Sequence, residues 1–158
     1  MASRSIEEIE YEILALSRHM TTAVGRSRRD KAVLDGSAYA LMSLLSIEGP
    51  MSIGTFADVT GLDASTLNRQ TAALLRDNYV ERIPDPDGGL ARQFRLTSHG
   101  EAVLETQRRE SCDTLAHTLR DWDETDRAEL MTVLRRLNKT IERRYVRPWP
   151  RTDGIENE

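Results

Sequence analysis

The sequence predicts a mainly α-helical fold: a winged helix-turn-helix domain, whose wing is a two-stranded β-hairpin, placed between N- and C-terminal helices. Three observations support this prediction. Two short helical patterns meet at a tight turn that contains Gly61, which is the arrangement of a helix-turn-helix. Two short β-like runs follow directly, separated by the turn-forming stretch PDPDGG at residues 84–89. Apolar residues spaced three and four apart form long stripes on both sides of this region.

Length and composition fit a small intracellular domain. The chain has 158 residues, of which 39% are apolar and 30% are charged, enough for one domain with extensions. No apolar run approaches the length that crosses a bilayer, and the acidic start of the chain is unlike a signal peptide. Cys112 is the single cysteine and cannot form an internal disulfide. These features predict a cytoplasmic protein with no membrane partner.

The first helix is expected from about residue 5 to residue 28. Its apolar stripe is narrow and of heptad type, so the helix should pack against few neighbours or against another chain. Charge is segregated along the sequence although the net charge is only −4. Acids gather in residues 7–12, whereas seven basic residues and only one acid occupy residues 135–151. The stripe consists of Ile6, Ile9, Ile13, Leu16, Met20 and then Ala23 or Val24.

Two further short helices precede the one that is most informative about function. The earlier one begins at Asp35 or Ser37 and ends before the Gly-Pro pair at residues 49–50. The later one begins at its N-cap Ser52 and ends at Gly61.

The next helix, which begins at Asp63 or Ser65, carries side chains suited to reading DNA. In a helix-turn-helix the first turns of the second helix meet base edges in the major groove. Asn and Gln can pair with adenine and Arg with guanine, while Ser and Thr near a helix start suit phosphates. Taken alone, these residues fit helix capping and solvation equally well; the following hairpin favours DNA. The candidate DNA-binding residues of this helix are Ser65, Thr66, Asn68, Arg69 and Gln70.

The wing is expected to pair two strands, Tyr79–Ile83 and Leu90–Thr97, across the Pro-, Asp- and Gly-rich turn. Asn78, just before the first strand, is a residue type that tolerates the left-handed conformation. Arg92 and Arg95 are the cations of the wing, and we expect them to contact phosphates or the minor groove.

Two long helices are predicted to complete the chain. Thr97 or Ser98 caps the first of them, and Asp123 and Asp126 have the spacing of a capping box at the start of the second. The last helix ends before Pro148, and residues 148–158 are expected to be disordered.

No residue pattern predicts an enzyme, a cofactor site or a metal site. The sequence has no glycine-rich phosphate loop and no Gly-x-Ser-x-Gly, and its histidines, His19, His99 and His117, lack partners at metal-ligand spacing. Cys112 lies on the apolar side of a long helix, so we interpret it as a small buried core residue rather than a redox sensor.

Residues 51–104 resemble the winged helix-turn-helix of the MarR (multiple antibiotic resistance regulator) family. The closest matches are TGLDASTLNRQTAALLRDNYVER, from residue 60, and the turn leading to LTSHG, which ends at residue 100. The resemblance implies an obligate homodimer and a sequence-specific transcriptional regulator, most often a repressor. Its partners would be a double-stranded, pseudo-palindromic DNA operator and a small, commonly phenolic or anionic, effector that releases the DNA.

The resemblance also implies a division of the chain. Residues 1–34 would form an N-terminal dimerisation helix, residues 35–100 the DNA-binding domain and residues 101–147 the C-terminal dimerisation helices. The acidic start and the basic end could then face each other across the dimer interface. An effector cavity near the dimer junction could be lined by His19, Met20, Tyr39 and Met42, although core packing explains these residues equally well.

The wing departs from the family pattern at its tip. The family's acidic residue falls on Gly88, and the arginine after it falls on Gly89 or Leu90, so the usual minor-groove arginine is replaced. This departure supports an alternative function, a winged-helix protein-interaction module that has lost DNA binding.

Overall fold

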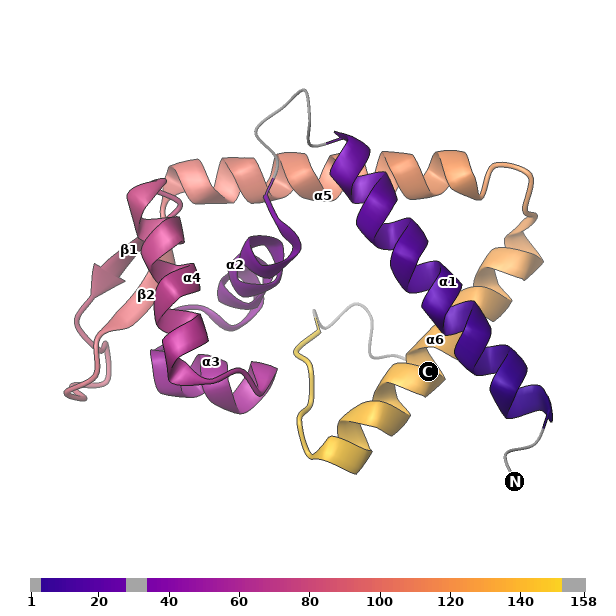
Figure 1. Cartoon of the computed structure of the whole chain (residues 1–158). Helices are drawn as coiled ribbons and strands as arrows, with labels where there is room; N and C mark the ends of the chain where they lie inside the picture. The colour runs from indigo at the N-terminus through magenta and orange to yellow at the C-terminus, as the bar shows by residue number, and fades with distance from the viewer. Residues whose placement is uncertain (1–3, 28–33, 152–158) are drawn as a thin grey trace. The chain divides into compact units, whose positions relative to one another are not determined.

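The computed structural model of the protein describes residues 4–27 and 34–151, and the side chains of residues 4–20 and 34–151. Within these ranges the chain forms six helices and one two-stranded sheet (Figure 1). The prediction of a mainly α-helical winged helix-turn-helix fold is confirmed. The described residues divide into two compact units, one formed by the first helix and the other beginning at Leu34.

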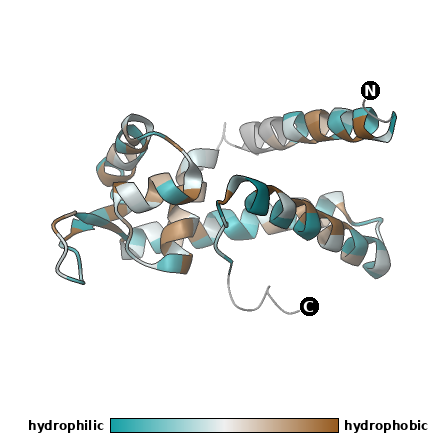
Figure 2. Cartoon of the chain, turned by 90° about the horizontal axis from the view of Figure 1, so that it is seen from below, coloured by the Kyte–Doolittle hydropathy of each residue, from teal (hydrophilic) through white to brown (hydrophobic). Residues whose placement is uncertain are grey.

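Helix α1 (Arg4–Ser27) forms where the sequence predicts it. Its apolar stripe is largely uncovered, because side chains such as Ile6, Ile9 and Leu16 are about half exposed. Figure 2 shows these apolar positions recurring between hydrophilic ones along the helix. An amphipathic helix gains little stability until such a stripe is buried, so α1 has a face that is suited to packing.

The winged domain contains helices α2 (Gly36–Glu48), α3 (Ile53–Thr60) and α4 (Ala64–Arg76), followed by strands β1 (Val80–Ile83) and β2 (Gln93–Leu96). Its core is mostly aliphatic, with Phe56 and Phe94 as the buried aromatic side chains. The two rings pack with their centroids 6.4 Å apart. The largest side chains with almost no exposed surface are Leu41, Met42, Leu44, Phe56, Leu67, Thr71 and Val80.

Each helix of this domain has a short polar residue as its N-cap. The carboxylate of Asp35 accepts a hydrogen bond from the backbone N–H of Ala38 at 2.8 Å, and the hydroxyl of Ser52 accepts one from Thr55 at 3.1 Å. Both side chains satisfy donors that the first helical turn leaves unpaired. Asp35 is therefore the N-cap of α2, rather than Ser37, which the sequence also allowed.

Strands β1 and β2 pair antiparallel, with Val80 opposite Leu96 and Ile83 opposite Gln93. The second strand is shorter than predicted, because residues 90–92 are not in the ladder. Leu90 is fully exposed in the loop that joins the strands. Asn78, just before β1, has a φ of 58°, the left-handed conformation that asparagine tolerates.

Helices α5 (Ser98–Thr118) and α6 (Glu124–Tyr145) begin at the predicted caps, Thr97 and Asp123. The start of α5 packs on the winged domain through Leu104, whereas α6 has no buried residue. Cys112 is exposed, so the prediction of a buried core residue is wrong for the single chain. The winged domain covers only the first turns of α5, which leaves residue 112 beyond its reach.

The chain continues in a defined path past α6 to residue 151. The sequence predicted disorder from residue 148, but Arg151 forms an ion pair with Glu142, and both side chains are mostly buried. Residues 152–158 of the predicted tail lie outside the described residues.

Candidate nucleic-acid interface

Helix α4 has one buried face and one exposed polar face. Leu67, Thr71 and Leu74, spaced four and three apart, pack into the core of the winged domain. The Thr71 hydroxyl is buried with a hydrogen-bond partner, because it donates to the Leu67 carbonyl oxygen at 2.8 Å. The opposite face is exposed and carries Ser65, Asn68, Arg69, Ala72 and Arg76.

The turn before α4 is held by glycine and by an N-cap. Gly61 has a φ of 73° and its N–H donates to the Ala57 carbonyl oxygen at 2.8 Å, which ends α3. Asp63 then caps α4 by accepting hydrogen bonds from the Thr66 backbone N–H at 2.9 Å and the Thr66 hydroxyl at 2.8 Å. These bonds, the backbone bond first, hold the pKa of Asp63 below its usual value. The turn therefore fixes where α4 begins and which way its exposed face points.

The structure separates the five residues that the sequence grouped on α4. Ser65, Asn68 and Arg69 are exposed and lie on the outer face. Thr66 is half-buried and uses its hydroxyl hydrogen on Asp63, which leaves its oxygen as an acceptor. Gln70 is also half-buried, and its amide oxygen is covered without a hydrogen-bond partner among the described residues. Thr66 and Gln70 are thus less available to a ligand than the other three.

The wing tip is a tight turn built around Asp85. The Gly88 N–H donates to the Asp85 carbonyl oxygen at 3.0 Å, and the Asp87 N–H donates to the Asp85 carboxylate at 2.9 Å. Asp, Pro and Gly at the first, second and fourth positions are typical of such a turn. Gly88 has a φ of 81°, a conformation that costs glycine little. Asp87 in this turn is exposed, and the turn carries no cation.

The cations of the wing differ in availability. Arg95 on β2 is bound to Glu81 on β1, and the closest distance, Nη2 to Oε1, is 2.6 Å. Arg92 is exposed and forms no ion pair with any residue that the structure describes. Arg82, which sequence reasoning missed, lies with its guanidinium carbon 5.5 Å from the centroid of the Phe94 ring. The strand register, which places Arg82 opposite Phe94, was the signal that could have identified it.

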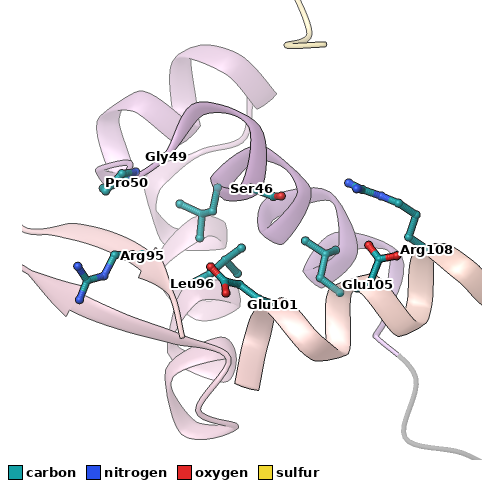
Figure 3. A pocket seen from close by; sticks show the side chains of 10 residues that line it. Ser46, Gly49, Pro50, Arg95, Leu96, Glu101, Glu105 and Arg108 are labelled. Atoms are coloured by element: carbon teal, nitrogen blue, oxygen red, sulfur yellow. The ribbon is translucent and has the colours of Figure 1, made fainter. Parts of the chain in front are cut away.

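A pocket of about 470 Å³ lies between α2, β2 and α5 (Figure 3). Its charges are mixed: Glu101, Glu105 and Arg108 come from α5, and Arg95 stands on β2. The apolar lining includes Leu45, Leu96 and Leu104. The described residues contain no group of His, Cys, Asp and Glu that could hold a metal ion.

The four residues considered for an effector cavity do not line this pocket. Met42 is fully buried in the core, and Tyr39 packs against that core. His19 and Met20 are exposed on α1, which forms a separate unit. In the part of the chain that the structure describes, no helix is long and apolar enough to cross a membrane.

Comparisons with known proteins agree with this architecture. The model of the MarR family matches residues 36–88. An uncharacterized HTH-type transcriptional regulator, YxaD of Bacillus subtilis (strain 168), is 29% identical over 136 residues, which cover 86% of this chain and 94% of YxaD.

Solved structures that share the fold include these two. One is a MarR family protein from Bacillus stearothermophilus, with a TM-score of 0.78 and 19% identity over 89% of this chain and 98% of that one. The other is the PcaV transcriptional regulator from Streptomyces coelicolor in complex with its natural ligand. Its TM-score is 0.66, with 19% identity over 90% of this chain and 100% of that one. At these identities the likeness concerns the fold alone.

Proposed function

Because the chain belongs to the MarR family of winged helix-turn-helix transcriptional regulators, we propose that it is a dimeric, sequence-specific DNA-binding repressor that acts in the cytoplasm. The observation that carries the proposal is the exposed polar face of α4. A helix anchored by Leu67 and Leu74 presents Asn68 and Arg69 outward, in the element that enters the major groove in a helix-turn-helix. Such an arrangement serves recognition rather than catalysis.

The three outer residues have different roles in this proposal. Arg69 forms no ion pair within the described part of the chain, so its guanidinium is available to pair bidentately with guanine. Asn68 would pair with adenine. Ser65, in the first turn, would bind a phosphate near the positive end of the helix. Thr66 shapes the start of the helix, and Gln70 is expected to contribute little to base reading.

The wing would add to DNA affinity mainly by contacting the sugar-phosphate backbone. Arg92 is the cation best placed for a phosphate, because Arg95 is already neutralised by Glu81. A tip formed around Gly88 and Gly89 offers no cation to the minor groove. We therefore propose that the specificity of this protein comes from α4 rather than from the wing.

The exposed apolar stripes support a second copy of the chain as partner. The α6 stripe includes Leu134, Leu137 and Ile141, each about two-fifths exposed or more, and α1 carries a comparable stripe. Burial of such stripes between two chains would stabilise both. A two-fold dimer presents two α4 helices, which matches a pseudo-palindromic operator. The acidic start of α1 and the basic end of α6 could set the pairing register.

Light scattering coupled to gel filtration tests the dimer. Leu137→Asp places a carboxylate in the stripe. It should give a folded monomer, or a dimer with a much larger dissociation constant. Thr132→Asp adds the same charge on the opposite, polar side of α6, where residue 132 is exposed, and should remain dimeric. If both variants keep the mass of a dimer, the α6 stripe is not the interface.

A small phenolic or anionic effector that weakens DNA binding is the second part of the proposal. It is supported by the fold that this chain shares with PcaV, which was solved with its natural ligand. A ligand that binds one conformation of a dimer better than another shifts the DNA affinity by that difference.

The DNA proposal is tested by fluorescence anisotropy with duplexes from the region upstream of the protein's own gene. We expect saturable binding that weakens as salt rises and that unlabelled copies of the same fragment compete away better than unrelated DNA. A folded dimer that binds none of these duplexes would refute the proposal. That result would favour the alternative, a winged-helix protein-interaction module, which the pairing of Arg95 with Glu81 and the lack of a cation at the wing tip also fit.

A further inference from the structure

The side chain of Arg147, just past the end of α6, contacts Gly61 in the turn of the helix-turn-helix, within the unit that begins at Leu34. The guanidinium of Arg147 lies directly over the Cα atom of Gly61. A Cβ atom at residue 61 would be 1.8 Å from Arg147 Nη1 and 2.6 Å from Cζ. These distances are far below any van der Waals contact, so the close approach depends on glycine. Gly61 therefore serves both the left-handed turn and this contact.

The backbone that carries Arg147 is fixed by a sharp turn at the end of α6. Val146 adopts the left-handed conformation, with φ 53° and ψ 42°, which is rare for a β-branched residue. The Arg147 N–H donates to the Glu142 carbonyl oxygen at 3.1 Å. Such a strained residue persists only where its surroundings hold it in place. The turn directs the chain away from the helix axis at residue 147.

An ion pair closes the segment that follows. Arg151 donates from Nη1 to Glu142 Oε2 at 2.9 Å and from Nη2 to Oε1 at 2.5 Å, and it also binds the Trp149 carbonyl oxygen at 3.0 Å. The hydrogen bonds from Arg151 hold the pKa of Glu142 below its usual value. Residues 146–151 thus form a closed segment, which we call the C-terminal hook.

Arg147, in the C-terminal hook, is free to bind a phosphate at a place where DNA is expected. Arg147 is exposed, and no carboxylate within residues 4–27 or 34–151 lies at ion-pair distance from it. Gly61 is two residues before Asp63, the N-cap of α4. In a helix-turn-helix bound to DNA, the helix before the turn crosses the sugar-phosphate backbone, and the helix after it enters the groove. A guanidinium held over the turn is thus beside the expected path of the backbone.

We propose that Arg147 binds a DNA phosphate, so that the C-terminal hook extends the DNA interface beyond the winged domain. This inference rests on the proposed function of α4. Arginine suits the role because its planar group presents several N–H donors and always carries its charge. A phosphate contact adds affinity without adding base preference, so Arg147 should act equally on all sequences.

The salt dependence of DNA binding tests this inference. The probes are two fluorescein-labelled duplexes, one from upstream of the gene and one of unrelated sequence. Arg147→Gln keeps a long polar side chain but removes the charge. Loss of one phosphate contact in each protomer should make the slope of log K against log salt shallower by about 0.9 per protomer on both duplexes. Arg147→Lys should restore most of the slope. The matched control, Arg136→Gln, removes the same charge about three turns earlier on α6 and should change the slope less.

A second measurement does not depend on the stability of these variants. A benzophenone attached to Arg147→Cys, in a chain that also carries Cys112→Ser, should crosslink to either duplex on illumination. The same group attached to Arg136→Cys should not crosslink. Crosslinking from both positions, or from neither, would contradict the assignment.

The outcomes distinguish this inference from the proposed function. If the unmodified protein binds neither duplex, both are wrong. If it binds and Arg147→Gln has the same salt slope as the Arg136→Gln control, only the role of Arg147 is wrong. A loss confined to the upstream duplex would also overturn it, because that would indicate base reading rather than phosphate binding.

Discussion

Arg95 on β2 donates two hydrogen bonds to the Glu81 carboxylate on β1, from Nε at 3.1 Å and from Nη2 at 2.6 Å. The strand register places the two residues directly opposite each other. Both side chains are about half exposed, so the pair adds little to stability. Its larger effect is electrostatic, because a cation that the sequence assigns to DNA is already neutralised within the wing.

Glu81→Gln should therefore strengthen DNA binding. The change removes one acid and frees Arg95, so the salt slope should steepen by up to about 0.9 per protomer if Arg95 then meets a phosphate. The free energy of unfolding, measured by urea denaturation, should change by less than about 1 kcal/mol. Glu129→Gln removes the same charge from exposed α6 and serves as the control. Equal salt slopes for the two variants would show that Arg95 does not reach DNA even when it is released.

Arg69→Ala should weaken binding to the cognate operator by about 1–3 kcal/mol and relax preference at one position in each half-site. Anisotropy titrations against duplexes with single base-pair changes measure both effects. Gln70→Ala is the informative comparison, because its amide oxygen is buried. It should change stability more than base preference. If the two variants lose the same base preference, the division of α4 into inner and outer faces is wrong.

Much of the fold follows from local sequence, because its signals are local. The caps Ser52, Thr97 and Asp123 and the stop at Gly61 depend on residues within one helical turn. The end of the wing was less predictable. The run from Leu90 looks like a strand, but a turn that begins at Asp85 leaves Leu90 in solvent.

The sequence predicted which polar residues α4 carries, but it did not predict which of them face outward. The sequence shows that α4 carries polar residues, whereas choosing the inner face requires knowing that Thr71 is buried and satisfied by the Leu67 carbonyl. Contacts between distant residues were beyond local reasoning. Nothing in the periodicity of α6 connects Arg147 with Gly61, or suggests that Arg151 turns back to Glu142. The same reasoning expected this segment to be disordered from residue 148.

Gly100→Ala should lower the free energy of unfolding by about 1–3 kcal/mol, the usual cost of overpacking. A Cβ atom there would be 2.0 Å from the Tyr79 carbonyl oxygen, and that atom is backbone, so the start of α5 must move away from the wing. Gly54→Ala is the matched control in the first turn of α3, where a Cβ would be 3.6 Å from its nearest neighbour, Ser52 Oγ. It should raise the free energy of unfolding by about 0.5–1 kcal/mol. Urea denaturation of both variants measures these changes. Changes of the same sign in the free energy of unfolding would contradict the packing argument.

Asp63 should make the stability of the winged domain depend on acidic pH. Hydrogen bonds from the Thr66 backbone and hydroxyl lower its pKa in the folded state from the usual 3.8. A depressed carboxyl pKa contributes stability at pH values above the unfolded pKa, and this contribution is lost as the pH falls through the folded pKa. Asp63→Asn keeps an N-cap oxygen but not the charge. The wild-type protein should therefore be more stable than Asp63→Asn at neutral pH in urea denaturation, and the difference should shrink below pH 3.8. A difference that stays constant across this range would mean that the Asp63 carboxylate adds nothing beyond a neutral cap.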